Sequence, residues 1–254
     1  MNPNENRERM TQIMFEKFEV PAYVYCWSYG IPLDIGDGTY YTIPVLKGKP
    51  EHHAIDCIEY SGSQLTNYLM KILYKRGYNL TSVVEREIVR DIKEKLCYVA
   101  LDYQQELDKV SSSGLEKQYT LPDKNVISVA SERFHCPEAL FQPHLIGKAD
   151  DGIHHKVFES IMKCDIRSRR SLFGNIILAG GSTLFPGLAE RMQKELSVLA
   201  PEDLTAKVIA PPTRGMAVWV GASTVAALPT FDMMWITKAN YDEEGPKVIN
   251  QKCV

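Results

Sequence analysis

The run from Asn175 to Arg191, NIILAGGSTLFPGLAER, constrains the fold more than any other part of this chain. It predicts a buried strand at Ile176 to Ala179, a sharp turn at two glycines, and a helix. A short apolar run of this kind is typical of a parallel strand covered on both faces, and glycine lets the backbone come close to a ligand. The pattern predicts an α/β fold in which the turn is either a nucleotide shelf or only a turn.

The residues after the glycine turn predict a helix that starts at once. Ser182 and Thr183 can cap it, and Leu188, Met192 and Leu196 recur at helical spacing. Free amide groups and the positive end of that helix would then face outward at the end of the strand.

A second glycine-containing segment, Asp34-Ile-Gly-Asp-Gly38, falls where the alternation between residues 31 and 46 predicts a β-hairpin. From the residues alone, Asp37 and Gly38 are most simply explained as its tight turn. Small residues are also what a phosphate loop needs, because a side chain would push the phosphate away from the backbone amides.

The segment 61–147 predicts two amphipathic helices, with apolar stripes at Leu65 to Leu73 and at Val84 to Leu96. On the second helix Arg90, Lys93 and Glu94 point away from the stripe, which predicts a solvated charged face.

The two ends of the chain predict one helix each. A helix at 6–18 would have Met10, Ile13, Met14 and Lys17 on one face. A helix at 216–228 has a largely apolar side, for which buried packing is the simplest explanation.

Composition narrows the class of protein. Hydrophobic residues make up 44% and charged residues 24%, as in folded globular proteins. The net charge of −3 gives no reason to expect nucleic acid or an anionic membrane. No apolar run approaches membrane-spanning length, and the start of the chain lacks the apolar core of a signal peptide. The six cysteines form no C-x-x-C pair. We therefore expect an intracellular protein with reduced thiols.

Long runs of the chain resemble the actin family from one end to the other. They are Arg9–Glu16, Asp34–Gly38, Glu85–Asp102, Cys136–Pro143, Ile209–Pro212 and the ending Gln251–Val254. The resemblance covers the later two-thirds of an actin subunit. It implies an incomplete actin-like (ribonuclease-H-like) α/β fold with an inserted small α/β lobe.

The resemblance also implies a division of the chain. Residues 1–30 would be a remnant of the first domain half, and residues 31–60 and 148–215 would form the large-lobe nucleotide domain. Residues 61–147 would be the inserted small outer lobe, and residues 216–254 a C-terminal helical segment packing on the first domain half.

An actin-like site would bind ATP or ADP with Mg²⁺ or Ca²⁺. Asp34 would be the catalytic residue and would reach the metal only through water, without a direct metal ligand from the chain. The implied nucleotide-binding residues are Gly36, Asp37, Gly38, Arg90, Lys93, Glu94, Gly180, Gly181, Ser182, Thr183 and Phe185. The implied partner cleft, which receives helices of other proteins, is Val220, Thr224, Val225, Leu228 and Met234.

Departures from the family cluster at the nucleotide. The chain has one Asp-x-Gly-x-Gly loop where the family has two, and residues 24–28 offer no match for the glutamine that positions water. Tyr41 replaces a histidine near that water, Ile35 replaces a small hydroxyl residue, and Gly215 replaces a lysine beside the adenine. These changes predict that ATP binding is weak or absent and that hydrolysis is impaired, and they leave open whether the chain is an enzyme.

The resulting expectation is a cytoplasmic, cytoskeletal actin-like protein with a partial ATP site, which acts by binding actin-like subunits or actin-binding proteins. Two alternatives stay open. One is a shortened form of a conventional filament-forming, ATP-hydrolysing actin, whose native chain would exceed 28.8 kDa. The other is a nucleotide-independent interaction module of an actin-related assembly.

Overall fold

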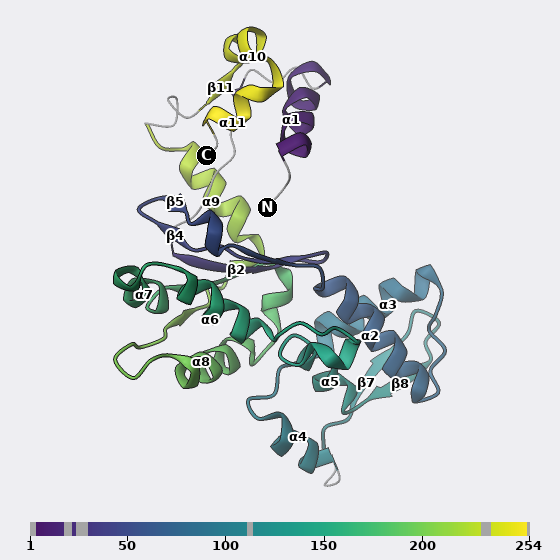
Figure 1. The fold of residues 1–254 in the computed structure, drawn as a ribbon. Coiled ribbons are helices and arrows are strands. Elements are labelled where there is room, and N and C mark those ends of the chain that lie inside the picture. Colours follow the sequence, from purple (N-terminus) through teal and green to yellow (C-terminus); the bar gives the residue numbers. More distant parts are fainter. Residues whose placement is uncertain (1–3, 18–21, 24–29, 111–113, 230–234, 253–254) are drawn as a thin grey trace. The chain divides into compact units, whose positions relative to one another are not determined.

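The computed structural model describes residues 4–17, 22–23, 30–110, 114–229 and 235–252 (Figure 1). The chain forms two compact units. Unit 1 comprises residues 1–29, 45–50 and 217–254, and unit 2 comprises residues 30–44 and 51–216.

A five-stranded mixed sheet lies at the centre of unit 2. Its order is β10 (Val208–Ile209), β9 (Ile176–Ala179), β2 (Ile31–Ile35), β3 (Tyr40–Thr42) and β6 (Asp56–Ile58). The first three strands are parallel, and β2, β3 and β6 are antiparallel. The predicted strand and hairpin are confirmed, and their pairing puts Asp34 beside Ala179.

In unit 2, α6 (Ile153–Lys163) packs against both α7 (Ile166–Phe173) and α8 (Leu188–Leu199) near the sheet. α6 also contacts β3 and the 3₁₀ turn η2 (His52–Ala54). The apolar side predicted for α8 is fully buried, which confirms the helical spacing.

Residues 62–146 of unit 2 form a second group of elements, drawn to the right of α6 to α8 (Figure 1). It contains α2 (Gly62–Lys75), α3 (Val83–Leu96), α4 (Tyr103–Lys109), β7 (Lys117–Thr120), β8 (Val126–Val129), α5 (Glu132–Glu138) and the 3₁₀ turn η4 (Pro143–Ile146). β7 and β8 form an antiparallel hairpin, and α2 packs against α3 and α5. The further division of unit 2 at residues 61 and 147 stays a prediction.

The stripes predicted for α2 and α3 are only partly right. On α2, Leu65, Leu69 and Leu73 are buried as expected. On α3, Val84 is 75% exposed, whereas Lys93 is only 4% exposed. The predicted solvated face is therefore wrong for Lys93, because α2 supplies oxygen acceptors that allow a lysine to be buried.

Unit 1 brings together segments from both ends of the chain. It contains α1 (Asn4–Gln12), the π-helical turn η1 (Ile13–Lys17), β1 (Ala22–Tyr23), β4 (Val45–Leu46), β5 (Lys49–Pro50), α9 (Ala217–Ala226), β11 (Ile236–Thr237), α10 (Lys238–Glu244), the 3₁₀ turn η8 (Gly245–Val248) and α11 (Ile249–Lys252). β1 pairs with β11, and β4 pairs with β5. Phe15 stacks on Tyr241 with ring centres 4.7 Å apart, inside a core completed by Ile236, Val248 and Ile249.

The helices at the two ends differ from their predictions in which side chains they bury. In the first, Thr11 and Phe15 are buried and Lys17 is exposed, because the π-helical turn shifts the angular spacing of the side chains. In α9, Trp219 is 70% exposed and Val218 is 67% exposed. The prediction that the apolar side of the helix at 216–228 is buried is therefore wrong for the single chain, without a partner.

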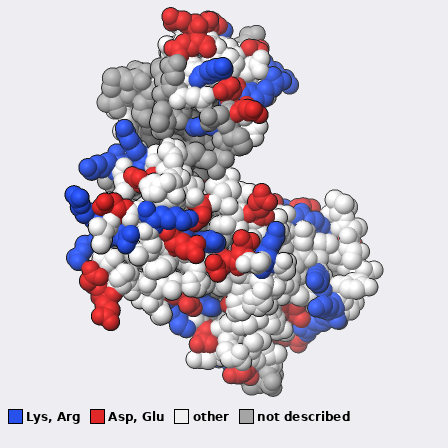
Figure 2. Space-filling model, viewed as in Figure 1, with Lys and Arg blue, Asp and Glu red and all other residues white. Residues whose placement is uncertain are grey.

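Charge is mixed over the surface of unit 2. On the face drawn in Figure 2, lysine and arginine side chains are interspersed with aspartate and glutamate. Among the residues that the structure describes, no helix is long and apolar enough to cross a bilayer.

A buried ion pair ties α8 to α5. The Arg191 guanidinium donates to both carboxylate oxygens of Glu138 at 3.2 Å and to the Ala100 carbonyl oxygen at 2.9 Å. It also lies 4.7 Å from the centre of the Phe141 ring. Glu138 is completely buried, and burial raises the pKa of its carboxyl group while Arg191 opposes that shift.

We expect Arg191→Met to lower the free energy of unfolding by about 3–5 kcal/mol near neutral pH, because the Glu138 carboxylate would stay buried without its cation. The folded-state pKa of Glu138 would rise further above its unfolded value. A raised folded-state pKa means that the folded protein holds the Glu138 proton more tightly than the unfolded chain does. The resulting stabilisation is fully present below the unfolded pKa and is lost as the pH rises through the folded pKa. The deficit of the variant should therefore shrink on acidification, which denaturant unfolding at several pH values would measure.

Lys95→Met is the control, because Lys95 pairs with Asp91 at 2.7 Å on an exposed helix surface. It should cost less than about 1 kcal/mol. Equal losses in the two variants would contradict a special contribution from the buried pair.

Candidate functional site

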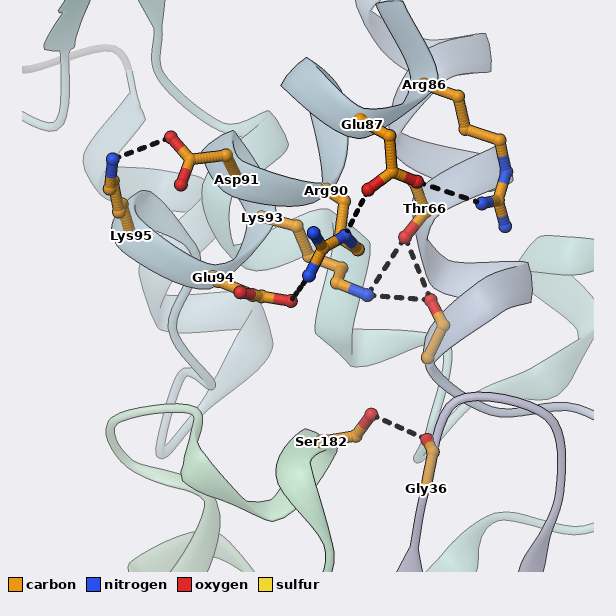
Figure 3. A network of polar contacts seen from close by, with 11 residues as sticks. Gly36, Thr66, Arg86, Glu87, Arg90, Asp91, Lys93, Glu94, Lys95 and Ser182 are labelled. Carbon is orange, nitrogen blue, oxygen red and sulfur yellow. Dashed lines mark hydrogen bonds and ion pairs between the residues drawn. The ribbon is translucent and has the colours of Figure 1, made fainter. Parts of the chain in front are cut away.

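The loop from Asp34 to Gly38 joins β2 to β3 and is anchored through one carbonyl oxygen. The Gly36 oxygen accepts hydrogen bonds from the Ser61 hydroxyl, from the Gly62 amide at 3.2 Å, and from the Ser182 hydroxyl at 2.9 Å. Figure 3 shows Ser182 directed at Gly36 across the site. The loop thereby contacts both the start of α2 and the glycine turn after β9.

Asp34 lies at the end of β2, opposite Tyr41 on β3. Its carboxyl group is half-buried, and burial raises its pKa. A Cβ atom added to Gly180 would lie 2.5 Å from the Asp34 Oδ1 atom and 2.4 Å from the Ile35 carbonyl oxygen. Glycine at position 180 is therefore required for the two strand ends to approach one another.

The start of α2 closes a second side of the site. The Ser63 amide donates to the Asp37 carbonyl oxygen at 2.7 Å, and the Ser61 amide donates to the Gln64 side chain at 3.0 Å. A Cβ atom on Gly62 would meet the Ser182 hydroxyl oxygen at 2.7 Å. The positive end of a 14-residue helix thus lies against the loop.

Lys93 reaches this helix start from α3. Its Nζ atom donates to the Gly62 carbonyl oxygen at 2.7 Å and to the Thr66 hydroxyl oxygen at 2.9 Å (Figure 3). Burial lowers the pKa of Lys93, while the charge of Asp37 is among the influences that raise it. The structure therefore places a buried cation behind the loop.

Arg90 and Glu94 lie on the outer surface of α3. Arg90 pairs with Glu87 at 2.8 Å and with Glu94 at 3.2 Å, and all three side chains are about half exposed. Figure 3 shows Arg90 joined to Glu87 and to Glu94 along α3. The contacts of Arg90 are with its own helix, so its role toward a ligand stays a prediction.

The glycine turn differs from its prediction. Residues Gly181–Leu184 form a 3₁₀ turn, η5, and α8 begins only at Leu188, after Gly187 in the left-handed conformation. The Thr183 hydroxyl donates to the Gly180 carbonyl oxygen at 2.7 Å instead of capping a helix. The helix start at the site therefore belongs to α2, and the prediction that α8 supplies it is wrong.

Side chains along η5 divide between the core and solvent. Thr183 is completely buried and Phe185 is only 6% exposed, whereas Leu184 is 48% exposed. Leu184 lies beside Gly215, at which an added Cβ atom would meet it at 3.1 Å. Contacts of Thr183 and Phe185 with a nucleoside stay predictions.

Sequence reasoning missed Ser61, Gly62 and Thr66, which complete the site. The available signal was Ser61-x-x-Gln64, a capping-box pattern before an amphipathic stripe. Nothing in the pattern indicated that this helix start would face Asp37.

The site therefore combines a loop of the Asp-x-Gly-x-Gly kind, a helix start, a buried lysine and a Gly-Gly turn. A family model described as Actin matches the sequence over residues 1–254. The chain belongs to the actin family. Its mixed α/β architecture in unit 2 is that of an actin-like fold.

Within the described part of this actin-family chain, no group of three or more His, Cys, Asp or Glu side chains could hold a metal ion. Four of the partner-cleft positions can be placed on or next to α9, and Met234 lies outside the described residues. Val220 is 37% exposed and Leu228 is 49% exposed, and Thr224 is exposed as well.

We expect Gly180→Ala to destabilise the protein by about 2 kcal/mol or more, because its φ of +87° disfavours alanine and the new methyl group would clash with Ile35 and Asp34. Thermal or denaturant unfolding would measure the loss. Gly181→Ala is the matched control, since its Cβ atom would meet nothing within 4 Å. Similar stability of the two variants would contradict the close approach of the strand ends.

Proposed function

We propose that this actin-family protein binds ATP or ADP with a divalent cation weakly, that its hydrolysis of ATP is impaired, and that it acts by binding actin-like subunits or actin-binding proteins. The observation that carries the proposal is the convergence of two segments, the start of α2 and the glycine turn, on the Gly36 carbonyl oxygen, with the Lys93 ammonium behind them.

The backbone of the site fits a phosphate chain. A Cβ atom added to Gly38 or to Gly181 would meet nothing within 4 Å, so the space on the side-chain side of both residues is open. Amide groups of Asp37 and Gly38 would hold phosphate oxygens, and the α2 start adds a favourable dipole. Ser182 and Gly181 to Phe185 would form the adenosine side, with Lys93, Glu94 and Arg90 at the sugar and base edge.

The cation would be held by phosphate oxygens and water, with Asp34 oriented toward its water shell. A bound cation would neutralise phosphate charge and polarise the terminal phosphoryl group. A half-buried carboxylate suits a place next to such a charge, because the cation would offset the desolvation that raises its pKa.

Weak binding is expected from the donor count. The chain supplies one loop of the Asp-x-Gly-x-Gly kind. Each charge-assisted hydrogen bond to phosphate contributes roughly 1.5–3 kcal/mol, so the second loop of the family represents a large share of the affinity.

Impaired hydrolysis is expected from the residue opposite Asp34. Tyr41 occupies this position on β3, where the family has a histidine near the attacking water. A phenol cannot exchange protons near neutral pH as an imidazole does. Ile35, which replaces a small hydroxyl residue, is completely buried beside the loop.

Partner binding is supported by the exposure of Val220 and Thr224 on α9 and of Leu228 just after it. Lys47 and Lys49 are exposed and add positive charge to the β4–β5 hairpin. In the family this strand pair is a subunit contact, so the proposal favours divergent partners over ordinary actin subunits.

Thermal unfolding with and without magnesium-ATP tests the nucleotide site. At about ten times the dissociation constant, ATP should stabilise the folded chain by roughly 1.4 kcal/mol and raise the midpoint by about 3–5 °C. Gly38→Ala should abolish the shift, because its methyl group would stand between phosphate and the backbone amides, whereas Gly221→Ala should retain it. The same samples should release no phosphate above the buffer background. An unchanged midpoint in the wild-type chain would instead favour the nucleotide-independent interaction module, and rapid phosphate release would refute impaired hydrolysis.

Leu228→Asp tests the partner surface. Leu228 is 49% exposed, so the substitution should change the free energy of unfolding by less than about 0.5 kcal/mol. It should weaken binding of an amphipathic helical peptide of the kind that actin-binding proteins insert, measured by calorimetry. Unfolding of the variant, or unchanged peptide affinity, would contradict this assignment.

A further inference from the structure

A separate cavity of about 210 Å³ lies on unit 2 between α2 and the end of η4, where it is lined by Ile146 and Lys148. None of the predicted nucleotide-binding residues lines it. Its lining consists of Gln64, Asn67, Tyr68, Lys71, Ile146 and Lys148.

The α2 residues of this cavity form one stripe of the helix. Positions 64, 67, 68 and 71 follow the i, i+3, i+4, i+7 spacing that aligns side chains along one face. Leu65, Leu69 and Leu73 are buried on another face of the same helix. Burial of that core face fixes the rotation of α2, so the polar stripe is directed at the cavity.

The opposite wall is a closed turn. Gly147 has a φ of +76°, its amide donates to the His144 carbonyl oxygen at 3.0 Å, and the Lys148 amide donates to the Pro143 carbonyl oxygen at 3.1 Å. These bonds end η4 and hold the backbone of Ile146 and Lys148 in a defined position.

The cavity presents hydrogen-bond donors and no carboxylate. Within the described ranges, neither the Lys71 nor the Lys148 ammonium has a hydrogen bond or an ion pair. The Asn67 side-chain oxygen accepts a hydrogen bond from the Arg86 guanidinium at 3.1 Å. The NH₂ group of Asn67 can therefore donate to a ligand in the cavity. Burial raises the pKa of Tyr68, so its hydroxyl stays protonated and can donate.

We propose that this cavity binds a phosphate group, either free or as a monoester on another molecule. Two ammonium groups match the charge of about −1.5 to −2 that a phosphate monoester carries, and its oxygens can accept from the amide and the phenol at the same time. A monocarboxylate would leave one ammonium uncompensated. The Ile146 side chain supplies an apolar wall for the carbon adjoining a phosphate ester.

Lysine acetylation followed by mass spectrometry tests the proposal residue by residue on the full chain. Inorganic phosphate at three-quarters occupancy should slow acetylation of Lys71 and Lys148 about fourfold relative to chloride of equal ionic strength. Lys75, which is exposed on the same helix outside the cavity, should react at an unchanged rate. Because each lysine is read separately, phosphate binding at the nucleotide loop would not imitate this result.

Lys148→Gln should remove the phosphate protection of Lys71, whereas Lys75→Gln should leave it intact. A phosphoserine peptide that protects at lower concentration than inorganic phosphate would identify a phosphorylated protein as the ligand, and equal potency would identify a small phosphate compound. Equal behaviour of Lys71, Lys148 and Lys75, or equal protection by chloride, would overturn the proposal.

Discussion

The carbonyl oxygen of Gly36 is the interaction on which the candidate site depends. Hydrogen bonds from Ser61, Gly62 and Ser182 converge on it from two elements far apart in sequence. They require the parallel pairing of β2 with β9 and the close approach of Gly180 to Asp34. Together these contacts hold the loop, the helix start and the glycine turn in one place, and these three segments define the site.

Buried charged side chains in unit 2 are stabilised in two ways, by an opposite charge or by neutral hydrogen-bond acceptors. Arg191 and Glu138 neutralise each other, so their burial serves the packing of α8 on α5. Lys93 instead donates to neutral oxygens of Gly62 and Thr66, with the charge of Asp37 among the nearby influences on its pKa. That difference is the physical reason for the proposal that Lys93 serves the nucleotide site and not only helix packing.

Unit 1 contains a small apolar core and a helix, α9, whose apolar side chains are exposed. Phe15 and Tyr241 bring both ends of the chain together, whereas α9 exposes Val218 and Trp219. Even the hydroxyl groups of Ser223 and Thr224 donate to carbonyl oxygens of their own helix. A helix with apolar side chains and internally satisfied hydroxyls is suited to contact with other protein surface.

The sequence by itself determined the family, the strand at Ile176–Ala179 and the hairpin around Gly38, because these depend on local runs and spacing. Only the tertiary structure decided the burial of Lys93, the exposure of Trp219 and the choice of α2 over α8 as the helix start at the site. Periodicity describes one helix at a time. It cannot show which oxygen acceptors a neighbouring helix offers to a lysine, or whether an apolar face has protein packed against it.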